Sequence, residues 1–344
     1  MTSFASLAVD HRLGDHSKLS KLAKLIDWDR FNKYLSKIHK SDINPANGGR
    51  ESYDKISMLK LILLGQWNSM SDPELEYAIR IRLDFISFCG FDINGDIPDH
   101  STICRFRNKL IEKGLLERLL GEVNDQLVGL GLKVEKTNLA ILDATIIESN
   151  SRPKNKILEE EIPEDRKEDE SNINHFKEIK SSDPDATWLK KGSKSHFGYK
   201  SFATTDEEGF IDKTMTVPAN ESEINKLEDM IIDADKFSGD KGYDSKGNRE
   251  ALRNKRIKTR IMYRKPKNKP MTIWQKRFNK AVSKKRFRVE QTFGTLKRKF
   301  KFTKASYFTT KKVQAQFTMK AICLNLLKAV NKVTLIPPPG LQTG

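Results

Sequence analysis

The chain has 344 residues and a formal net charge of +17, and 32% of its residues are charged and 37% hydrophobic. This composition is typical of a globular protein, and the length suits one large domain or two ordinary ones. It excludes a membrane-spanning helix, because no run of about 18 apolar residues occurs, and the N-terminus lacks the basic-then-apolar order of a secretion signal.

The three cysteines, Cys89, Cys104 and Cys323, lie far apart in the sequence. They form no CxxC pair of the kind that binds zinc, and their odd number does not suit a disulfide framework. We therefore expect buried thiols in a reducing compartment.

The positive charge is concentrated in the last quarter of the chain. Residues 251–344 contain 26 lysines and arginines and a single acid, Glu290, so that the preceding 250 residues are net acidic. Such a segment attracts polyanions through counterion release, which favours a nucleic-acid partner. The alternative is a solvated basic face without a partner. Aromatic residues spread through the segment indicate that it folds.

Residues 1–135 have the pattern of a helical domain. Apolar spacing predicts helices over 52–67, from Ser71 to about residue 88, from Pro98 onward, and over 115–130. Ser71, Pro73 and Glu74 supply a helix start with a capping box. The helix that begins near Pro98 carries three cations, Arg105, Arg107 and Lys109. Short helices with one basic member resemble a helix-turn-helix reader of DNA, although a plain helical bundle would look the same.

After Gly131 the pattern changes to alternating strands and helices. We expect strands over 137–147, 196–205 and 210–217, a helix over 227–237, and a short strand that ends at Asp240. A helix from 245, a strand near 257–263, a basic helix over 274–300 and an apolar helix over 315–330 follow. This order predicts a mixed α/β layer fold. The insertion at about 149–191 holds eight acids in residues 159–170, which indicates a solvated segment. A DNA mimic is the functional alternative.

Phosphodiester chemistry by two divalent ions requires a few carboxylates on rigid elements inside a cationic surface. Asp143 fits, because it lies in an apolar strand where a lone charge is costly; a capping aspartate is the structural alternative. Asp240 fits because it ends a short strand between two glycines, with Asp235 and Asp244 as competitors.

Glu290 is the most informative acid, since it is alone among the cations of a helix expected to bind a polyanion. At 100° per residue, Arg286, Glu290 and Lys297 fall within about 60° of one another, beside an apolar stripe. The structural alternative is a surface ion pair between Arg286 and Glu290.

Several motifs together resemble those of bacterial insertion-sequence transposases with an Asp-Asp-Glu triad, in the fourth/fifth insertion-sequence family group. The resemblance covers about 53–327. It rests on 71–76, 97–102 and 105–107 in the first half, and on 143–148, 183–188, 198–200, 216–220 and 240–245 in the core.

The family signature on the last catalytic helix is Tyr, two residues, Arg, three residues, Glu, six residues, Lys. Arg286, Glu290 and Lys297 match it in type and spacing, whereas Ser283 stands in place of the tyrosine. The departure leaves the triad intact and bears only on a DNA contact that the tyrosine would make.

The resemblance implies a ribonuclease-H-like mixed sheet flanked by helices, preceded by an all-helical domain that recognises DNA ends. We expect domains at 1–135 and 136–334 and a tail at 335–344. Asp143, Asp240 and Glu290 would hold two Mg²⁺ ions, for which Mn²⁺ could substitute. The expected DNA contacts are those of Arg286, Lys297, Lys200 and Lys241, with Arg105, Arg107 and Lys109 in the first domain.

The expected activity is cleavage at terminal inverted repeats and joining of the 3′-hydroxyl ends to target DNA. The expected assembly is a homodimer on DNA, in the bacterial cytoplasm and associated with the nucleoid. Two alternatives stay open from the sequence: a nuclease with the same core, and a non-catalytic DNA-binding regulator.

Overall fold

The structure is a computed structural model that describes residues 17–38, 52–151, 157–159, 176–178, 181–265 and 269–335. Most of the predicted acidic insertion and the predicted tail beyond residue 335 lie outside these ranges. None of the helices in the described ranges combines the length and the hydropathy needed to cross a bilayer.

The first part of the chain is helical, as predicted. Its elements are α2 (Lys18–Leu25), the 3₁₀ turn η2 (Trp28–Phe31), α3 (Asn32–Leu35), α4 (Lys55–Asn68), α5 (Asp72–Ile81), α6 (Leu83–Cys89), α7 (His100–Glu112) and α8 (Leu116–Gly129). The predicted capping box exists: the Ser71 hydroxyl accepts from the backbone N–H of Glu74, and the Glu74 carboxylate accepts from that of Ser71. The single helix predicted from Ser71 to residue 88 is wrong, because extended backbone at Arg82 divides it into α5 and α6.

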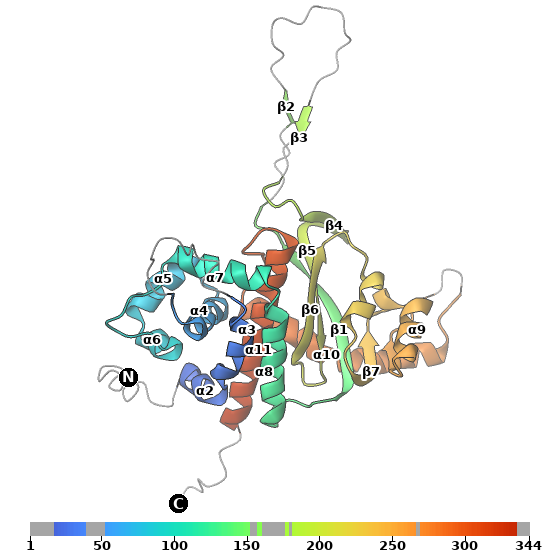
Figure 1. Cartoon of the computed structure of the whole chain (residues 1–344). Helices are drawn as coiled ribbons and strands as arrows, with labels where there is room; N and C mark the ends of the chain where they lie inside the picture. The colour runs from blue at the N-terminus through green and yellow to red at the C-terminus, as the bar shows by residue number, and fades with distance from the viewer. Residues whose placement is uncertain are drawn as a thin grey trace, which may run out of the picture.

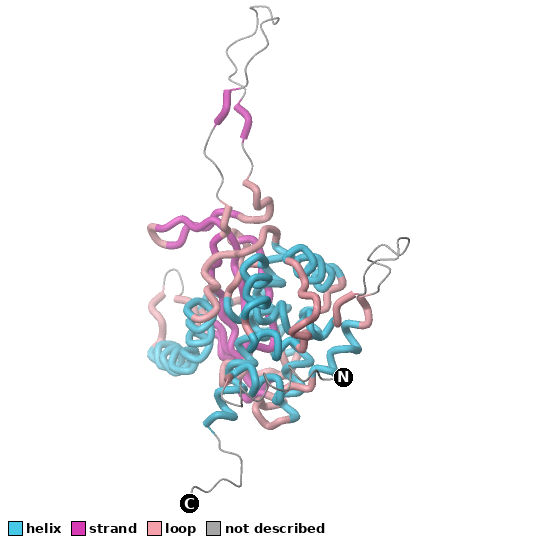
Figure 2. The backbone as a smooth tube through the Cα atoms, turned by 90° about the vertical axis from the view of Figure 1, so that its left-hand side faces the viewer, coloured by secondary structure: helices cyan, strands magenta, loops and turns pink. Residues whose placement is uncertain are grey.

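The second part contains one six-stranded mixed sheet. Its strands are β1 (Thr137–Glu148), β4 (Thr187–Lys191), β5 (Lys194–Thr205), β6 (Ile211–Pro218), β7 (Ala234–Gly239) and β8 (Lys258–Ile261). Strand β5 pairs antiparallel with β1, β4 and β6, whereas β1, β7 and β8 are parallel neighbours. This is the expected ribonuclease-H-like mixed sheet. A separate ribbon of β2 (Ile157–Glu159) and β3 (Phe176–Glu178) stands away from the body (Figure 2).

Successive side chains of β1 point to opposite faces of the sheet and pack in two different hydrophobic cores. Leu139 and Ile141 pack in the core that contains the last two helices, α10 (Ile273–Arg298) and α11 (Thr310–Leu335). Ala140 and Leu142 pack in the core that contains residues of α9 (Lys246–Asn254). Since side chains of a strand alternate between its faces, Asp143 lies on the face that α10 covers.

The helix predicted over 227–237 is wrong. The chain there makes the 3₁₀ turns η4 (Glu223–Lys226) and η5 (Glu228–Met230) and then enters β7. Leu227, Met230 and Ile231 are buried, and their spacing imitates a helical stripe. Pairing of Ala234 and the following residues with β1 wins over helix formation, because it supplies the sheet with a central strand.

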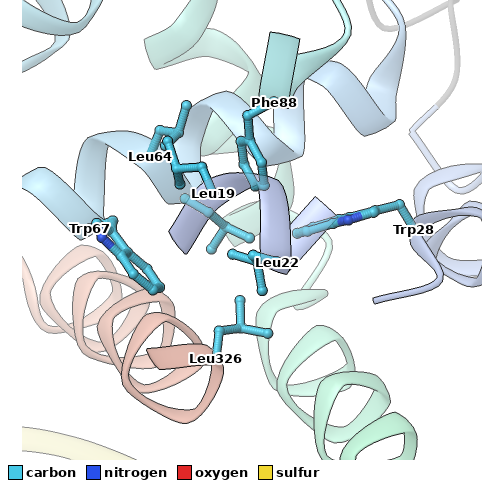
Figure 3. Close-up of a pocket in the computed structure, with 8 residues that line it drawn as sticks. Leu19, Leu22, Trp28, Leu64, Trp67, Phe88 and Leu326 are labelled. Atoms are coloured by element: carbon cyan, nitrogen blue, oxygen red, sulfur yellow. The ribbon is translucent and has the colours of Figure 1, made fainter. Parts of the chain in front are cut away.

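The two parts of the chain share one hydrophobic core, which runs from α2 to α11. Helices α8 and α11 lie between the N-terminal helices and the sheet (Figure 1). Leu326 of α11 reaches into an apolar pocket lined by α2, α4, α6 and η2 (Figure 3). Helix α11 therefore packs against both parts of the chain.

Candidate active site

Two of the predicted carboxylates lie on adjacent parallel strands. Ile141 of β1 is in register with Ser238 of β7, and two further residues along each strand bring Asp143 opposite Asp240. Asp143 is held within the strand, whereas Asp240 follows the last residue of β7 and begins the 3₁₀ turn η6 (Lys241–Tyr243). Because neighbouring strands are about 4.8 Å apart, the sheet alone places the two carboxylates side by side.

Helix α10 crosses this pair and contributes Arg286. Its guanidinium lies 3.0 Å from Oδ1 of Asp143 and 3.4 Å from Oδ1 of Asp240, so one side chain bridges both carboxylates. Burial raises the pKa of Asp143 and the nearby Asp240 charge adds to this effect, while Arg286 opposes it. The arrangement is a pair of partly exposed carboxylates that share one guanidinium.

Glu290 lies one helical turn beyond Arg286, on an exposed position of α10. Lys297, on the same side of the helix, is also exposed. Burial and the neighbouring Lys191 lower the pKa of Lys297, while the charge of Asp143 raises it, so Asp143 lies within electrostatic reach. Arg286 and Lys297, which flank Glu290 along α10, therefore both lie within electrostatic reach of Asp143.

The three acids do not form a closed metal site. Within the described ranges, no three His, Cys, Asp or Glu side chains are gathered closely enough to hold one ion. The structure thus joins Asp143 and Asp240 through Arg286, and Glu290 does not belong to that cluster.

The surroundings of the acidic pair nevertheless fit a hydrated divalent ion. The hydroxyls of Tyr243 and Ser238 are buried without a hydrogen-bond partner. Burial raises the pKa of Tyr243, as do the charges of Glu223, Asp143 and Asp240. Buried polar groups without partners are rare in folded proteins, and here they accompany oxygen donors of the type that hard divalent ions prefer.

The other predicted cations of this part have different surroundings. Lys241 is exposed next to Asp240. Lys200 is buried; its ammonium donates to the carbonyl of Glu221 at 2.7 Å and lies 3.5 Å from the Glu223 carboxylate. Lys200 therefore stabilises the turn beside η6 and is not part of an open surface.

In the first part of the chain, only one of the three predicted DNA contacts is on the surface. Arg105 is exposed, and its guanidinium donates to Ser101 and Thr102. Arg107 is buried and pairs with Asp72 through two hydrogen bonds of 2.6 and 2.7 Å. The ammonium of Lys109 is buried as well. Packing therefore withdraws the charges of Arg107 and Lys109 from the surface, where a DNA contact would need them.

The sequence did not single out Tyr243 or Met262, which lie beside the acidic pair. Tyr243 belongs to the motif that starts at Asp240, and Nη1 of Arg286 donates to Sδ of Met262 at 3.7 Å. Its place three residues after Asp240 is the one sequence signal by which Tyr243 could have been found. Met262 carries no such signal, because its place depends on the pairing of β7 with β8.

Comparisons with known proteins agree with this architecture. Residues 135–326 match the family model described as "Transposase DDE domain", and residues 7–109 match "Transposase domain (DUF772)". The chain is 40% identical over 269 residues to the "Transposase for insertion sequence element IS1106" of Neisseria meningitidis serogroup B, which covers 77% of this chain and 88% of the relative.

Two solved transposase structures also match, both with TM-scores below 0.5. A piggyBac transposase synaptic complex with hairpin DNA has a TM-score of 0.43 at 10% identity and covers 95% of this chain and 75% of its own. A Mos1 transposase paired-end complex has a TM-score of 0.19 at 8% identity, with 79% and 88% covered. On the family models and the Neisseria relative, this chain belongs to the bacterial insertion-sequence transposases with a DDE catalytic domain.

Proposed function

We propose that Asp143, Asp240 and Glu290 together hold two divalent ions, Mg²⁺ or Mn²⁺, and carry out DNA cleavage and strand transfer. The observation that carries this proposal is the adjacency of Asp143 and Asp240 across β1 and β7, in contact with α10, whose only acid is Glu290. A DDE transposase requires such acids on rigid elements, and the sheet and the long helix provide them.

Each residue has a distinct role in this scheme. Asp143, held within β1, and Asp240, at the tip of β7, would bind the ions from the sheet side. Glu290 would complete the second site from α10. When bound, the ions would activate the attacking oxygen and stabilise the departing oxygen of the phosphodiester. Arg286 and Lys297 would contact the phosphates beside the cut.

The exposed cations of α10 would extend this contact along the DNA. Lys284, Lys285 and Arg288 are exposed beside Arg286, and Lys241 is exposed next to Asp240. Phosphate contacts of this kind position DNA without reading its sequence. The N-terminal helices, with Arg105 on the surface, would recognise the terminal inverted repeats.

Two ends of one element must be cut and joined together, so we propose a homodimer assembled on DNA. Sedimentation of the full chain with and without a DNA end tests this directly. A complex with two protein chains per pair of ends is expected, and one chain with one end would contradict it.

The catalytic proposal is tested with a DNA fragment that carries the element's own end, in Mn²⁺. Asp143→Asn and Asp240→Asn are expected to lower cleavage by more than about 100-fold, since even residues that only orient a metal ligand contribute about 10- to 100-fold. DNA binding by the variants should stay within about threefold of the wild type. Cleavage that survives both substitutions would overturn the proposal.

Joining is tested separately with pre-cut ends that already carry a 3′-hydroxyl. The wild-type protein is expected to join them to a target plasmid, and the same two variants are expected to fail. Cleavage without joining would identify a nuclease with the same core, and metal-independent binding without either reaction would identify a regulator.

A further inference from the structure

The bridge made by Arg286 occupies the space between the two carboxylates that are proposed to hold metal. Its guanidinium uses Nη2 on Asp143 and Nη1 on Asp240, and the Arg286 side chain is only 11% exposed. Oδ1 of Asp240 also accepts from the backbone N–H of Lys241 at 2.6 Å. One guanidinium therefore contacts both carboxylates.

A divalent ion and this guanidinium cannot share the same oxygens. Ions of the Mg²⁺ and Ca²⁺ type bind carboxylate oxygens at about 2.0–2.6 Å, which leaves no room for a guanidinium between them. The two cations would also repel each other at this short separation. A metal ion that bridges the two Oδ1 atoms therefore requires Arg286 to move away.

Arg286 keeps one donor with which to bind a competing partner once the guanidinium has left the pair. Nε of Arg286 is buried without a hydrogen-bond partner, so the bridge leaves one donor of the guanidinium unused. Arginine binds phosphate best through two parallel N–H groups, and Nε with Nη2 forms such a fork. The neighbours Lys284, Lys285 and Arg288 are exposed and would bring a phosphate to this position.

We propose that Arg286 is the counter-ion of the acidic pair in the DNA-free protein, and that a DNA phosphate withdraws it so that divalent ions can bind. This inference rests on the proposed function of Asp143 and Asp240. The proposed counter-ion role makes metal binding depend on DNA, since DNA and the divalent ions both favour the state in which Arg286 does not bridge the two carboxylates. By linkage, metal must strengthen DNA binding by the same factor by which DNA strengthens metal binding.

The experiment is titration calorimetry of the full chain with Mn²⁺ alone. Arg286→Gln is expected to bind Mn²⁺ at least about 10-fold more tightly than the wild type in the absence of DNA, within the usual range of coupling between sites. Lys297→Gln is the matched control, because it removes a cation that Asp143 senses but that does not bridge the pair. Its affinity for Mn²⁺ should change by less than about threefold, which corresponds to about 0.6 kcal/mol.

The second arm repeats the titration with an uncleavable DNA end. DNA is expected to raise the Mn²⁺ affinity of the wild type toward that of Arg286→Gln and to change the variant little. Arg286→Lys, which keeps the charge but lacks the fork, should fall between them and shows the effect if Arg286→Gln folds poorly. The inference is overturned if Arg286→Gln binds Mn²⁺ no more tightly than the wild type, or if Lys297→Gln gains as much.

Failure of this inference is distinguishable from failure of the proposed function. In the DNA-bound state, Asp143→Asn should abolish Mn²⁺ binding whatever Arg286 does. If it does so while Arg286→Gln leaves the affinity unchanged, only the counter-ion role fails. If Mn²⁺ binding is unchanged in Asp143→Asn, the proposed metal site itself is wrong, and the inference falls with it.

Discussion

Arg105 and Arg107 lie two residues apart on α7, yet their surroundings differ. Arg105 is exposed, whereas Arg107 pairs with Asp72 of α5 and lies over the ring of Tyr307, 4.4 Å from its centroid. The Tyr307 hydroxyl in turn accepts from Gln66 of α4. At the scale of single residues, Arg107 therefore joins two N-terminal helices to the segment between α10 and α11.

This arrangement predicts a stability effect for Arg107 and not for Arg105. Arg107→Met should lower the free energy of unfolding by about 3 kcal/mol, because it leaves the Asp72 carboxylate without its partner. Arg105→Met should change it by less than about 0.5 kcal/mol. Urea unfolding of both variants measures the difference. Equal stability of the two variants would contradict the structural role of Arg107.

At this scale the sequence predicts the acids better than their partners. Asp143 and Asp240 stand out because a lone acid in an apolar strand or at a strand tip requires compensation, and the sheet does place them together. The bridge by Arg286, and the burial of Arg107, depend on which elements pack against each other. Spacing along one helix carries no information about this.

Among the elements, α10 is held at its C-terminal end by a buried lysine of α11. Lys320 is 2% exposed, and its ammonium donates to the carbonyl of Phe300 at 2.7 Å. Burial lowers the pKa of Lys320 to about 8, while the nearby Cys323 opposes this shift and Lys301 adds to it. The hydrogen bond from Lys320 to Phe300 therefore holds the C-terminal end of α10, the helix that carries Glu290 and Lys297.

The lowered pKa of Lys320 gives a pH dependence whose sign is fixed. The unfolded chain binds this proton more tightly, so the free energy of unfolding rises with pH between about 8 and the ordinary value of 10.5. From pH 7.5 to pH 10, the free energy of unfolding of the wild type should rise by about 2 kcal/mol relative to that of Lys320→Met. Urea unfolding at the two pH values measures it, and a constant difference between the proteins would contradict the assignment.

Most elements were predicted well, but the helices predicted over 71–88 and 227–237 were wrong. The apolar run of β1 and the basic run of α10 matched their elements closely. The predicted helix over 227–237 failed, since Leu227, Met230 and Ile231 are spaced as in a helix but are buried by two 3₁₀ turns before β7. The spacing of apolar residues within this segment could not reveal that its last residues pair with β1 as strand β7.

For the whole molecule, the shared core makes the N-terminal helices and the sheet one packed body. Leu326 of α11 is 1% exposed and contacts the pocket formed by the N-terminal helices. Leu326→Ala should lower the free energy of unfolding by about 3 kcal/mol through loss of buried surface and cavity formation. Tryptophan fluorescence and circular dichroism should shift together. Separate transitions for the two probes would contradict a shared core.

The charge distribution also acts at the scale of the molecule. Replacing the exposed Lys284 and Lys285 of α10 by Gln should weaken DNA binding irrespective of sequence and reduce the slope of log K against log salt by about 2. Lys136→Gln is the control, because Lys136 precedes β1 and is paired with Asp233 and Asp235. Binding titrations at several salt concentrations measure the slopes. Equal loss in the control would contradict a DNA surface on α10.

The central claim is that three acids from β1, the tip of β7 and α10 share a pair of divalent ions once DNA is bound. Anomalous diffraction from crystals of the DNA-bound protein soaked in Mn²⁺ tests it most directly. We expect two manganese peaks, with oxygens of Asp143, Asp240 and Glu290 within about 2.3 Å of them and with Arg286 turned to a phosphate. Manganese bound without Glu290, or away from the Asp143–Asp240 pair, would contradict the account.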